Sequence, residues 1–246
     1  MPCCNRFGCN RASATVSVGR LGHCEVDRVR YIAVIADVVA SRNITDRAHV
    51  QEQLVEVLSL LNGANPQLVS PYTVTLGDEF QAVLSGADEL FYDAIAILGA
   101  LHPHRVRFAY GVGDIITPLN TKQAIGMDGP AFHLARDGIE ALKETGALFS
   151  VCGSMDKVWA SLVNAALAFV SHRASDWPKS RYQVLAGLHK GRSVRDLADS
   201  LDLTTQAVYK TIDRGALGPL ISMFDATAQA LNRCLEVEPP PCSPTS

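Results

Sequence analysis

Residues 29–37 read VRYIAVIAD, and residues 75–83 read TLGDEFQAV. The first stretch is an almost unbroken apolar run that ends in an acid, which predicts a central strand buried on both faces. In the second, Gly77 and Asp78 separate two strand-like segments, residues 68–75 and 79–84, which predicts a β-hairpin. Together they indicate a sheet whose central strand ends in an acidic side chain close to the hairpin turn.

Helices and strands alternate around these stretches as far as residue 152. The order is β-α-β-β-α-β, followed by one more helix and strand, and it predicts an α+β fold. We expect a ferredoxin-like or palm-type antiparallel sheet with its helices on one face. The remaining predicted segments are helices over 46–61 (capped by Thr45 or Asp46), 88–101 and 131–145, and strands over 105–112 and 147–152.

The second part of the chain has helical spacing and no strand signal. A long helix is predicted over 154–171, short helices over 180–188, 193–201 and 205–214, and an apolar helix after them. The net charge also changes sign, from about −7 over residues 31–150 to about +3 over residues 179–214. We therefore expect a disordered leader (1–28), a palm domain (29–153), a connector helix (154–178), a helix-turn-helix domain (179–235) and a disordered tail (236–246).

Composition excludes several classes of protein. The 246-residue chain is 48% hydrophobic and 19% charged, with a formal net charge of −3, so it is neither disordered overall nor a basic nucleic-acid coat. No apolar run reaches about 18 residues, so no membrane-spanning helix is expected. The seven cysteines do not follow zinc-site spacing, and the start does not read as a secretory signal. We expect a cytoplasmic protein in a reducing compartment.

Three acidic residues are predicted to meet at one edge of the sheet. Asp37 ends the central strand, and Asp78 and Glu79 sit at the hairpin turn. Carboxylates at neighbouring strand ends repel unless a cation lies between them, and Mg²⁺ or Mn²⁺ is the expected ion where phosphates are handled. A role in a turn or helix cap is the alternative for Asp37 and for Asp78. Nearby candidates for binding the phosphates of a nucleotide are Gly77, Arg42 and Arg47, although the arginines could simply pair with local acids.

Both acidic segments look like the metal-binding pair of nucleotide cyclases and of GGDEF-type diguanylate cyclases. Residues 129–136 are similar to the cyclase segment that carries an Asn and an Arg on one helix, which implies a nucleotide-binding role for Arg136. His133 stands at the Asn position, and Leu76 replaces the second glycine of the diguanylate cyclase motif. The resemblance implies a metal-dependent nucleotidyl cyclase or transferase as an alternative function, without identifying catalytic residues.

A longer resemblance covers about residues 29–150. The segments 37–42, 75–81, 107–113 and 125–132 follow one another as in the SatD family, which this chain resembles. These are bacterial proteins associated with a secretion-and-acid-tolerance locus. The resemblance implies a fold and a stress-response context, and it names no reaction.

Residues 193–214 are similar to helix-turn-helix regulators. Small Ala198 would let two helices cross closely, and the polar start of the second helix could enter a major groove. The alternative is a packing module or dimer interface with a solvated basic face. Expected contacts with bases come from Thr204, Thr205, Gln206 and Tyr209, and with phosphates from Lys210, Arg192, Arg195 and Arg214.

The sequence thus favours a DNA-binding regulatory protein whose palm domain binds a nucleotide or other small ligand with a divalent metal. A transferase-like enzyme and a pure protein-interaction module are the alternatives. The final helix is apolar enough to form a homodimer, or else to pack against the connector helix.

Overall fold

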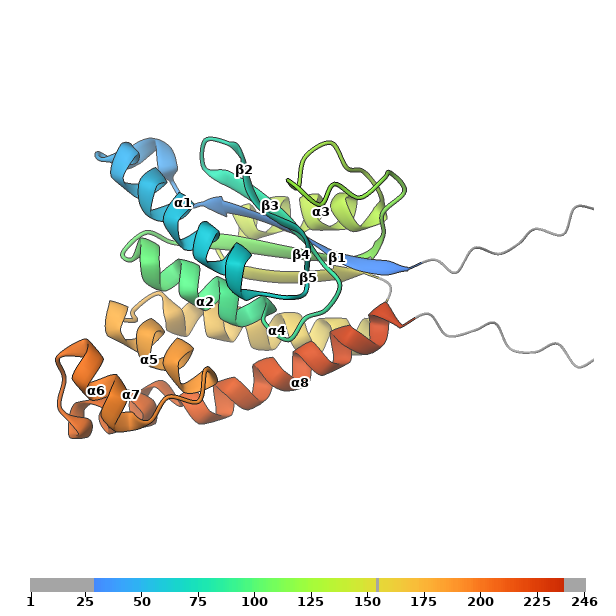
Figure 1. The fold of residues 1–246 in the computed structure, drawn as a ribbon. Helices are drawn as coiled ribbons and strands as arrows, with labels where there is room; N and C mark the ends of the chain where they lie inside the picture. The colour runs from blue at the N-terminus through green and yellow to red at the C-terminus, as the bar shows by residue number, and fades with distance from the viewer. Residues whose placement is uncertain (1–28, 154, 237–246) are drawn as a thin grey trace, which may run out of the picture.

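A computed structural model describes residues 29–153 and 155–236 of the chain (Figure 1). The leader and nearly all of the tail, both predicted to be disordered, lie outside these residues. The strands are β1 (Arg30–Val38), β2 (Leu68–Leu76), β3 (Glu79–Leu84), β4 (Val106–Asp114) and β5 (Phe149–Gly153). The helices are α1 (Arg47–Ala64), α2 (Leu90–Leu101), α3 (Pro130–Thr145), α4 (Lys157–Ala174), α5 (Lys179–His189), α6 (Val194–Leu201), α7 (Thr205–Gly215) and α8 (Leu217–Leu235), with a short 3-10 helix η1 (Ser41–Asn43) after β1.

The five strands form one sheet in the order β2-β3-β1-β4-β5. The predicted central strand β1 pairs antiparallel with both β3 and β4, and β2 pairs antiparallel with β3, which is the ferredoxin-like arrangement expected from the element order. The expectation of a purely antiparallel sheet is wrong, because β5 pairs parallel with β4. Helix α3 causes this difference, since it carries the chain back across the sheet between these two strands.

Helices cover both faces of the sheet, which corrects the expectation of one covered face. Ile32, Val34 and Ala36 of β1 point into a core shared with α1, α2 and the C-terminal helices, whereas Ala33 and Ile35 point into a second core under α3. Because alternate side chains of a strand point to opposite faces, an apolar run such as β1 requires cover on both sides.

Helix α3 lies unusually close to β4. A Cβ atom at Gly111 would collide with the carbonyl oxygen of Ala131, so only glycine leaves room for the first turn of the helix. The segment Gly111–Gly113 is part of β4 and pairs with Tyr31–Ala33 of β1.

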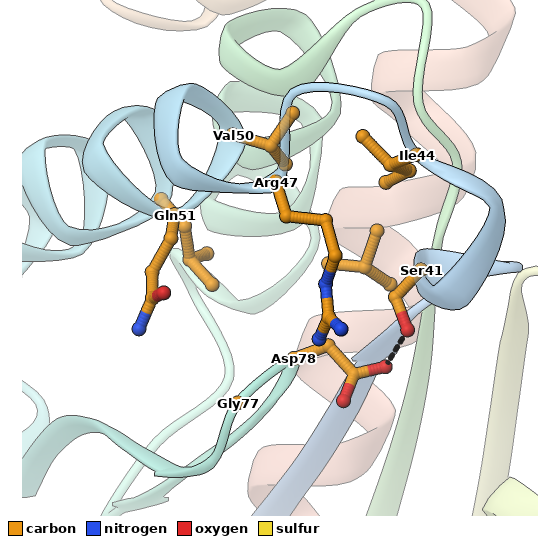
Figure 2. A pocket seen from close by; sticks show the side chains of 9 residues that line it. Ser41, Ile44, Arg47, Val50, Gln51, Gly77 and Asp78 are labelled. Atoms are coloured by element: carbon orange, nitrogen blue, oxygen red, sulfur yellow. Dashed lines mark hydrogen bonds between the residues drawn. The ribbon is translucent and has the colours of Figure 1, made fainter.

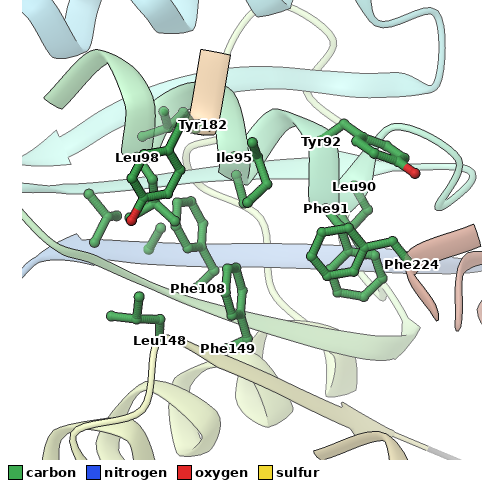
Figure 3. Packing of buried hydrophobic residues seen from close by; sticks show 14 of the residues in the cluster. Leu90, Phe91, Tyr92, Ile95, Leu98, Phe108, Leu148, Phe149, Tyr182 and Phe224 are labelled. Carbon is green, nitrogen blue, oxygen red and sulfur yellow. The ribbon is translucent and has the colours of Figure 1, made fainter. Parts of the chain in front are cut away.

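The C-terminal helices pack on the same face of the sheet as α2 (Figure 1). Phe224 of α8 stacks on Phe91 of α2 with ring centroids 4.9 Å apart, and Tyr182 of α5 is buried in the same cluster (Figure 3). One hydrophobic cluster thus runs from the sheet into the helices of the second part of the chain. Among the described helices, none combines the length and the apolar character that crossing a membrane requires.

Candidate functional site

The predicted acidic site lies where β1 ends beside the hairpin. Asp37 and Glu79 are direct partners in the β1–β3 register, and the amide of Val38 donates to the carbonyl oxygen of Asp78 at 3.1 Å. The backbone therefore brings all three predicted metal ligands to one edge, as expected. Their side chains nevertheless bind different partners.

Asp37 faces the α3 side of the sheet and is paired with an arginine. The guanidinium of Arg107, on β4, donates from Nε and Nη2 to the two carboxylate oxygens of Asp37, each at 2.9 Å. Only 12% of the Asp37 side chain and 14% of the Arg107 side chain are exposed. This two-bond geometry satisfies the carboxylate in a largely buried position. Arg107 was not among the predicted site residues, although a lone arginine inside an apolar strand indicates that a partner faces it.

Glu79 is held in the same way by the predicted nucleotide-binding residue Arg136. Nη1 and Nη2 of Arg136, on α3, donate to the Glu79 carboxylate at 2.6 and 2.9 Å. These hydrogen bonds raise the pKa of the guanidinium above its ordinary value. The Arg136 side chain is 46% exposed, so this pair lies nearer to solvent than Asp37 and Arg107.

Asp78 lies in a small pocket between the hairpin turn and the start of α1. Its carboxylate accepts a hydrogen bond from the hydroxyl of Ser41 on η1, and the guanidinium of Arg47 lies beside them (Figure 2). Gly77 forms the turn with a φ of +63°, a conformation that disfavours residues with a Cβ atom. The pocket encloses about 30 Å³, which is room for one or two water-sized groups. Ser41 was not among the predicted residues; its signal is a small hydroxyl four residues after Asp37.

This arrangement bears directly on the predicted Mg²⁺ or Mn²⁺ site. Asp37 and Glu79 are each bound by an arginine, and Asp78 is bound by a hydroxyl. In the part of the chain that the structure describes, no three His, Cys, Asp or Glu side chains are grouped so that they could share a metal ion. As placed, the three carboxylates are not arranged to share one ion, and the metal site stays a prediction.

Two predicted phosphate-binding arginines are available to a ligand. Arg42 on η1 and Arg47 at the start of α1 are exposed, and neither forms an ion pair within the described residues. Arg47 lies over the turn, with Nη2 3.8 Å from the position that a Cβ of Gly77 would take. Asp46 caps α1, as predicted, and accepts from the amide of His49 at 3.1 Å.

A second candidate site is formed by α6 and α7. Helix α6 begins at a capping box, in which Ser193 and Asp196 each accept from the other's amide, and it ends at Asp202 in the left-handed conformation. After Leu203, the hydroxyl of Thr204 accepts from the amide of Ala207 at 3.1 Å and starts α7. The two helices are therefore joined by a turn of three residues.

The side chains predicted to contact DNA divide into two groups. Thr205, Gln206, Tyr209 and Lys210 are exposed on the outer face of α7, and Arg195 on α6 and Arg214 at the end of α7 are exposed too. In contrast, Thr204 caps α7, and Arg192 donates to the hydroxyl of Ser200 at 2.8 Å and to the carbonyl oxygen of Asp196 at 3.0 Å. These two side chains are already engaged within the protein.

Comparisons with known proteins place these sites in context. The sequence model of the SatD family matches residues 31–217, which extends the resemblance seen from the sequence through α4, α5, α6 and α7. No curated protein matches the chain. A bacterial light-regulated adenylyl cyclase of known structure is 13% identical, with a TM-score of 0.38, over 52% of this chain and 44% of its own, so the chain spans less than half of that protein. A regulator of polyketide synthase expression from Bifidobacterium adolescentis is 15% identical, with a TM-score of 0.26, over 85% of this chain and 82% of its own.

Proposed function

The chain belongs to the SatD family, and from its C-terminal helices we propose that it is a regulatory protein that binds DNA through a helix-turn-helix formed by α6 and α7. The observation that carries this proposal is the three-residue turn between the two helices, followed by a polar, exposed start of α7. In helix-turn-helix proteins the second helix enters the major groove, and its N-terminal residues contact the base edges.

The packing of the two helices supports this assignment. Leu197 and Ala198 on α6 and Val208 on α7 are buried, and Leu203 in the turn packs against the same core. This leaves the opposite side of α7 exposed, with Tyr209 62% accessible. Burial of one face by apolar residues fixes the angle of the helix pair and presents the polar face outward.

Roles for the exposed residues follow from their chemistry. The amide group of Gln206 can pair with two atoms of adenine, and the hydroxyls of Thr205 and Tyr209 can bond to a base edge or a phosphate. Lys210, Arg195 and Arg214 would neutralise phosphates. Because Thr204 and Arg192 are engaged within the protein, we assign them to the geometry of the motif and not to DNA.

Selection of fragments from genomic DNA, followed by fluorescence anisotropy on the selected fragment, tests this function. The full chain should bind the selected fragment at least a hundredfold more tightly than a shuffled duplex. Gln206→Ala should lose most of this preference, and Lys122→Ala, a charge change in the exposed β4–α3 loop, should leave it unchanged. Equal affinity of the wild-type chain for both duplexes would reject specific DNA binding.

A nucleotide with Mg²⁺ or Mn²⁺ is our second proposal: its phosphates would lie at the mouth of the small pocket at Asp78, and the rest of the nucleotide would lie outside that pocket. Arg47 favours it, because its guanidinium has no ion pair within the described residues and lies beside the bare backbone of Gly77. An arginine in this position can hold a phosphate while Asp78 offers oxygen to a cation. If the site also turns over its ligand, the protein is a metal-dependent nucleotidyl cyclase or transferase.

Thermal unfolding with each nucleoside triphosphate and either metal tests this second proposal. A ligand at 100 times its dissociation constant adds about 2.7 kcal/mol of stability. The shift should disappear in Arg47→Ala and in Asp78→Asn but persist in Lys122→Ala. A cyclic or linear nucleotide product that is lost in Asp78→Asn would identify an enzyme, and the absence of any metal-dependent shift would reject the nucleotide site.

A further inference from the structure

A second pocket lies away from both sites, where α1, α2 and α5 meet. It encloses about 340 Å³. A single ion or water molecule needs only about 10–15 Å³, whereas small organic ligands occupy pockets of about 300 Å³ or more. Its lining combines apolar and charged side chains: Leu61, Ala64, Asn65, Tyr92, Ala96 and Ala186, with Glu89, Asp93, His189 and Lys190.

Asp93 is the buried polar group of this pocket, with only 3% of the residue exposed. One of its oxygens, Oδ2, accepts from Asn65 Nδ2 at 2.8 Å and from the hydroxyl of Tyr72 at 3.1 Å. The other oxygen, Oδ1, accepts no hydrogen bond from any described residue. These two donors are neutral, so the negative charge of Asp93 has no cation paired with it. A buried charge of this kind is costly unless a partner of opposite sign compensates it.

The other charged side chains do not supply that partner. Glu89 is a second carboxylate, and it is paired with His189 at 3.0 Å. The imidazole of His189 also stacks on the ring of Tyr92, with centroids 3.3 Å apart, so it is held against one wall. Lys190 is exposed and forms no ion pair within the described residues. The pocket is thus lined by two carboxylates, and the free ammonium group among its lining residues belongs to the exposed Lys190.

We infer that this pocket binds a small organic molecule through a primary ammonium group, which pairs with Asp93 Oδ1. Two classes of small molecule, polyamines and free amino acids, carry such an ammonium group. A polyamine would leave Lys190 unsatisfied, whereas a free amino acid would place its carboxylate near Lys190. This site is independent of DNA and of the pocket at Asp78, so its failure and theirs are separate results.

Isothermal titration of the full chain at pH 7.5 tests the site, with putrescine and L-alanine as separate probes. At least one probe should bind, and its affinity should fall at least tenfold in Asp93→Asn, which keeps the size of the side chain but removes its charge. Ala96→Leu, which fills the pocket without changing a charge, should abolish binding. Glu56→Gln is the matched control, since it removes one carboxylate from the exposed face of α1.

The Lys190→Gln variant distinguishes an amino acid from a polyamine as the ligand. Loss of affinity for L-alanine in Lys190→Gln identifies an amino acid, whereas tighter binding of putrescine in that variant identifies a polyamine. If Asp93→Asn fails to fold, as judged by circular dichroism, Ala96→Leu decides the result. The proposal is overturned if neither amine binds, if binding survives in the folded pocket variants, or if only magnesium or potassium chloride gives heat of binding.

Discussion

Asp37 and Glu79 stand opposite each other on β1 and β3, yet each carboxylate is bound by its own arginine from a different element. Two acids in direct cross-strand register would repel if both were unpaired. Arg107 from β4 and Arg136 from α3 remove this repulsion. The edge of the sheet is therefore a network of two ion pairs that tie three strands and a helix together.

The two pairs should differ in their effect on stability. Arg107→Ala leaves Asp37 largely buried without a partner and should lower the free energy of unfolding by about 3 kcal/mol. Arg136→Ala breaks a pair that is half exposed on the arginine side, so its cost should be below about 1 kcal/mol. Urea unfolding of both variants measures the difference. Equal losses would show that burial does not distinguish the two pairs.

The central strand and the hairpin could be predicted from the sequence because their signals are local. The apolar run predicts β1, and Gly77 and Asp78 predict the turn. Both strands of the hairpin lie where they were expected. The run in β1 also indicates cover on both faces. The position of α3 could not be predicted from the sequence. It depends on the close approach of α3 to Gly111 of β4, which only the assembled sheet defines.

The side-chain partners of the acidic site could not be predicted for a related reason. Arg107 is 70 residues from Asp37, and the two meet only through the register of β1 with β4. Strand pairing shows that the acids lie close in the backbone, but it does not show which side chains face them. Helix boundaries shift for local reasons: α4 starts at Lys157 and not at residue 154, because Asp156 accepts from the amides of Val158 and Trp159 and caps the helix there.

Asp93 should make stability depend on pH. Burial raises its pKa to about 6, although hydrogen bonds from Asn65 and Tyr72 oppose this, with smaller effects of Glu89 and Lys190. A carboxyl whose pKa is higher in the folded state than in the unfolded state favours folding when it is protonated. Its contribution is complete below about pH 4 and is lost as the pH rises through about 6.

Asp93→Asn should therefore be more stable than the wild type at pH 7.5, by on the order of 2–3 kcal/mol, because each pKa unit corresponds to about 1.4 kcal/mol. At pH 4 the two proteins should differ little. Urea unfolding at both pH values, with Glu56→Gln as the control, measures this. A variant that is less stable at pH 7.5 would show that the hydrogen bonds to the charged carboxylate outweigh its burial.

A homodimer needs a surface other than the apolar face of α8. Leu220, Phe224 and Leu231 of that helix are buried within the chain. Helix α4 instead exposes Val158, Leu162 and Phe169, which are 77%, 67% and 67% accessible and four and seven residues apart. This spacing is that of helices that pair along one apolar seam.

We expect light scattering to give twice the 26.4 kDa mass of the chain at tens of micromolar protein. Leu162→Glu should shift the mass to that of one chain, whereas Lys122→Ala, a charge change in the exposed β4–α3 loop, should not. A monomeric wild type, or a dimer that persists in Leu162→Glu, would exclude α4 as the interface.

The salt dependence of DNA binding separates the roles of Gln206 and Lys210. Lys210 is exposed one turn after Gln206, where it would meet a phosphate, so Lys210→Ala should weaken binding to all duplexes alike. It should also reduce the slope of log K against log salt by about 1, since one fewer counterion is released. Gln206→Ala should leave this slope unchanged but lose about 1–3 kcal/mol of preference for the selected sequence. If both variants changed the slope equally, α7 would contact only the DNA backbone, and the specificity would have to come from elsewhere in the protein.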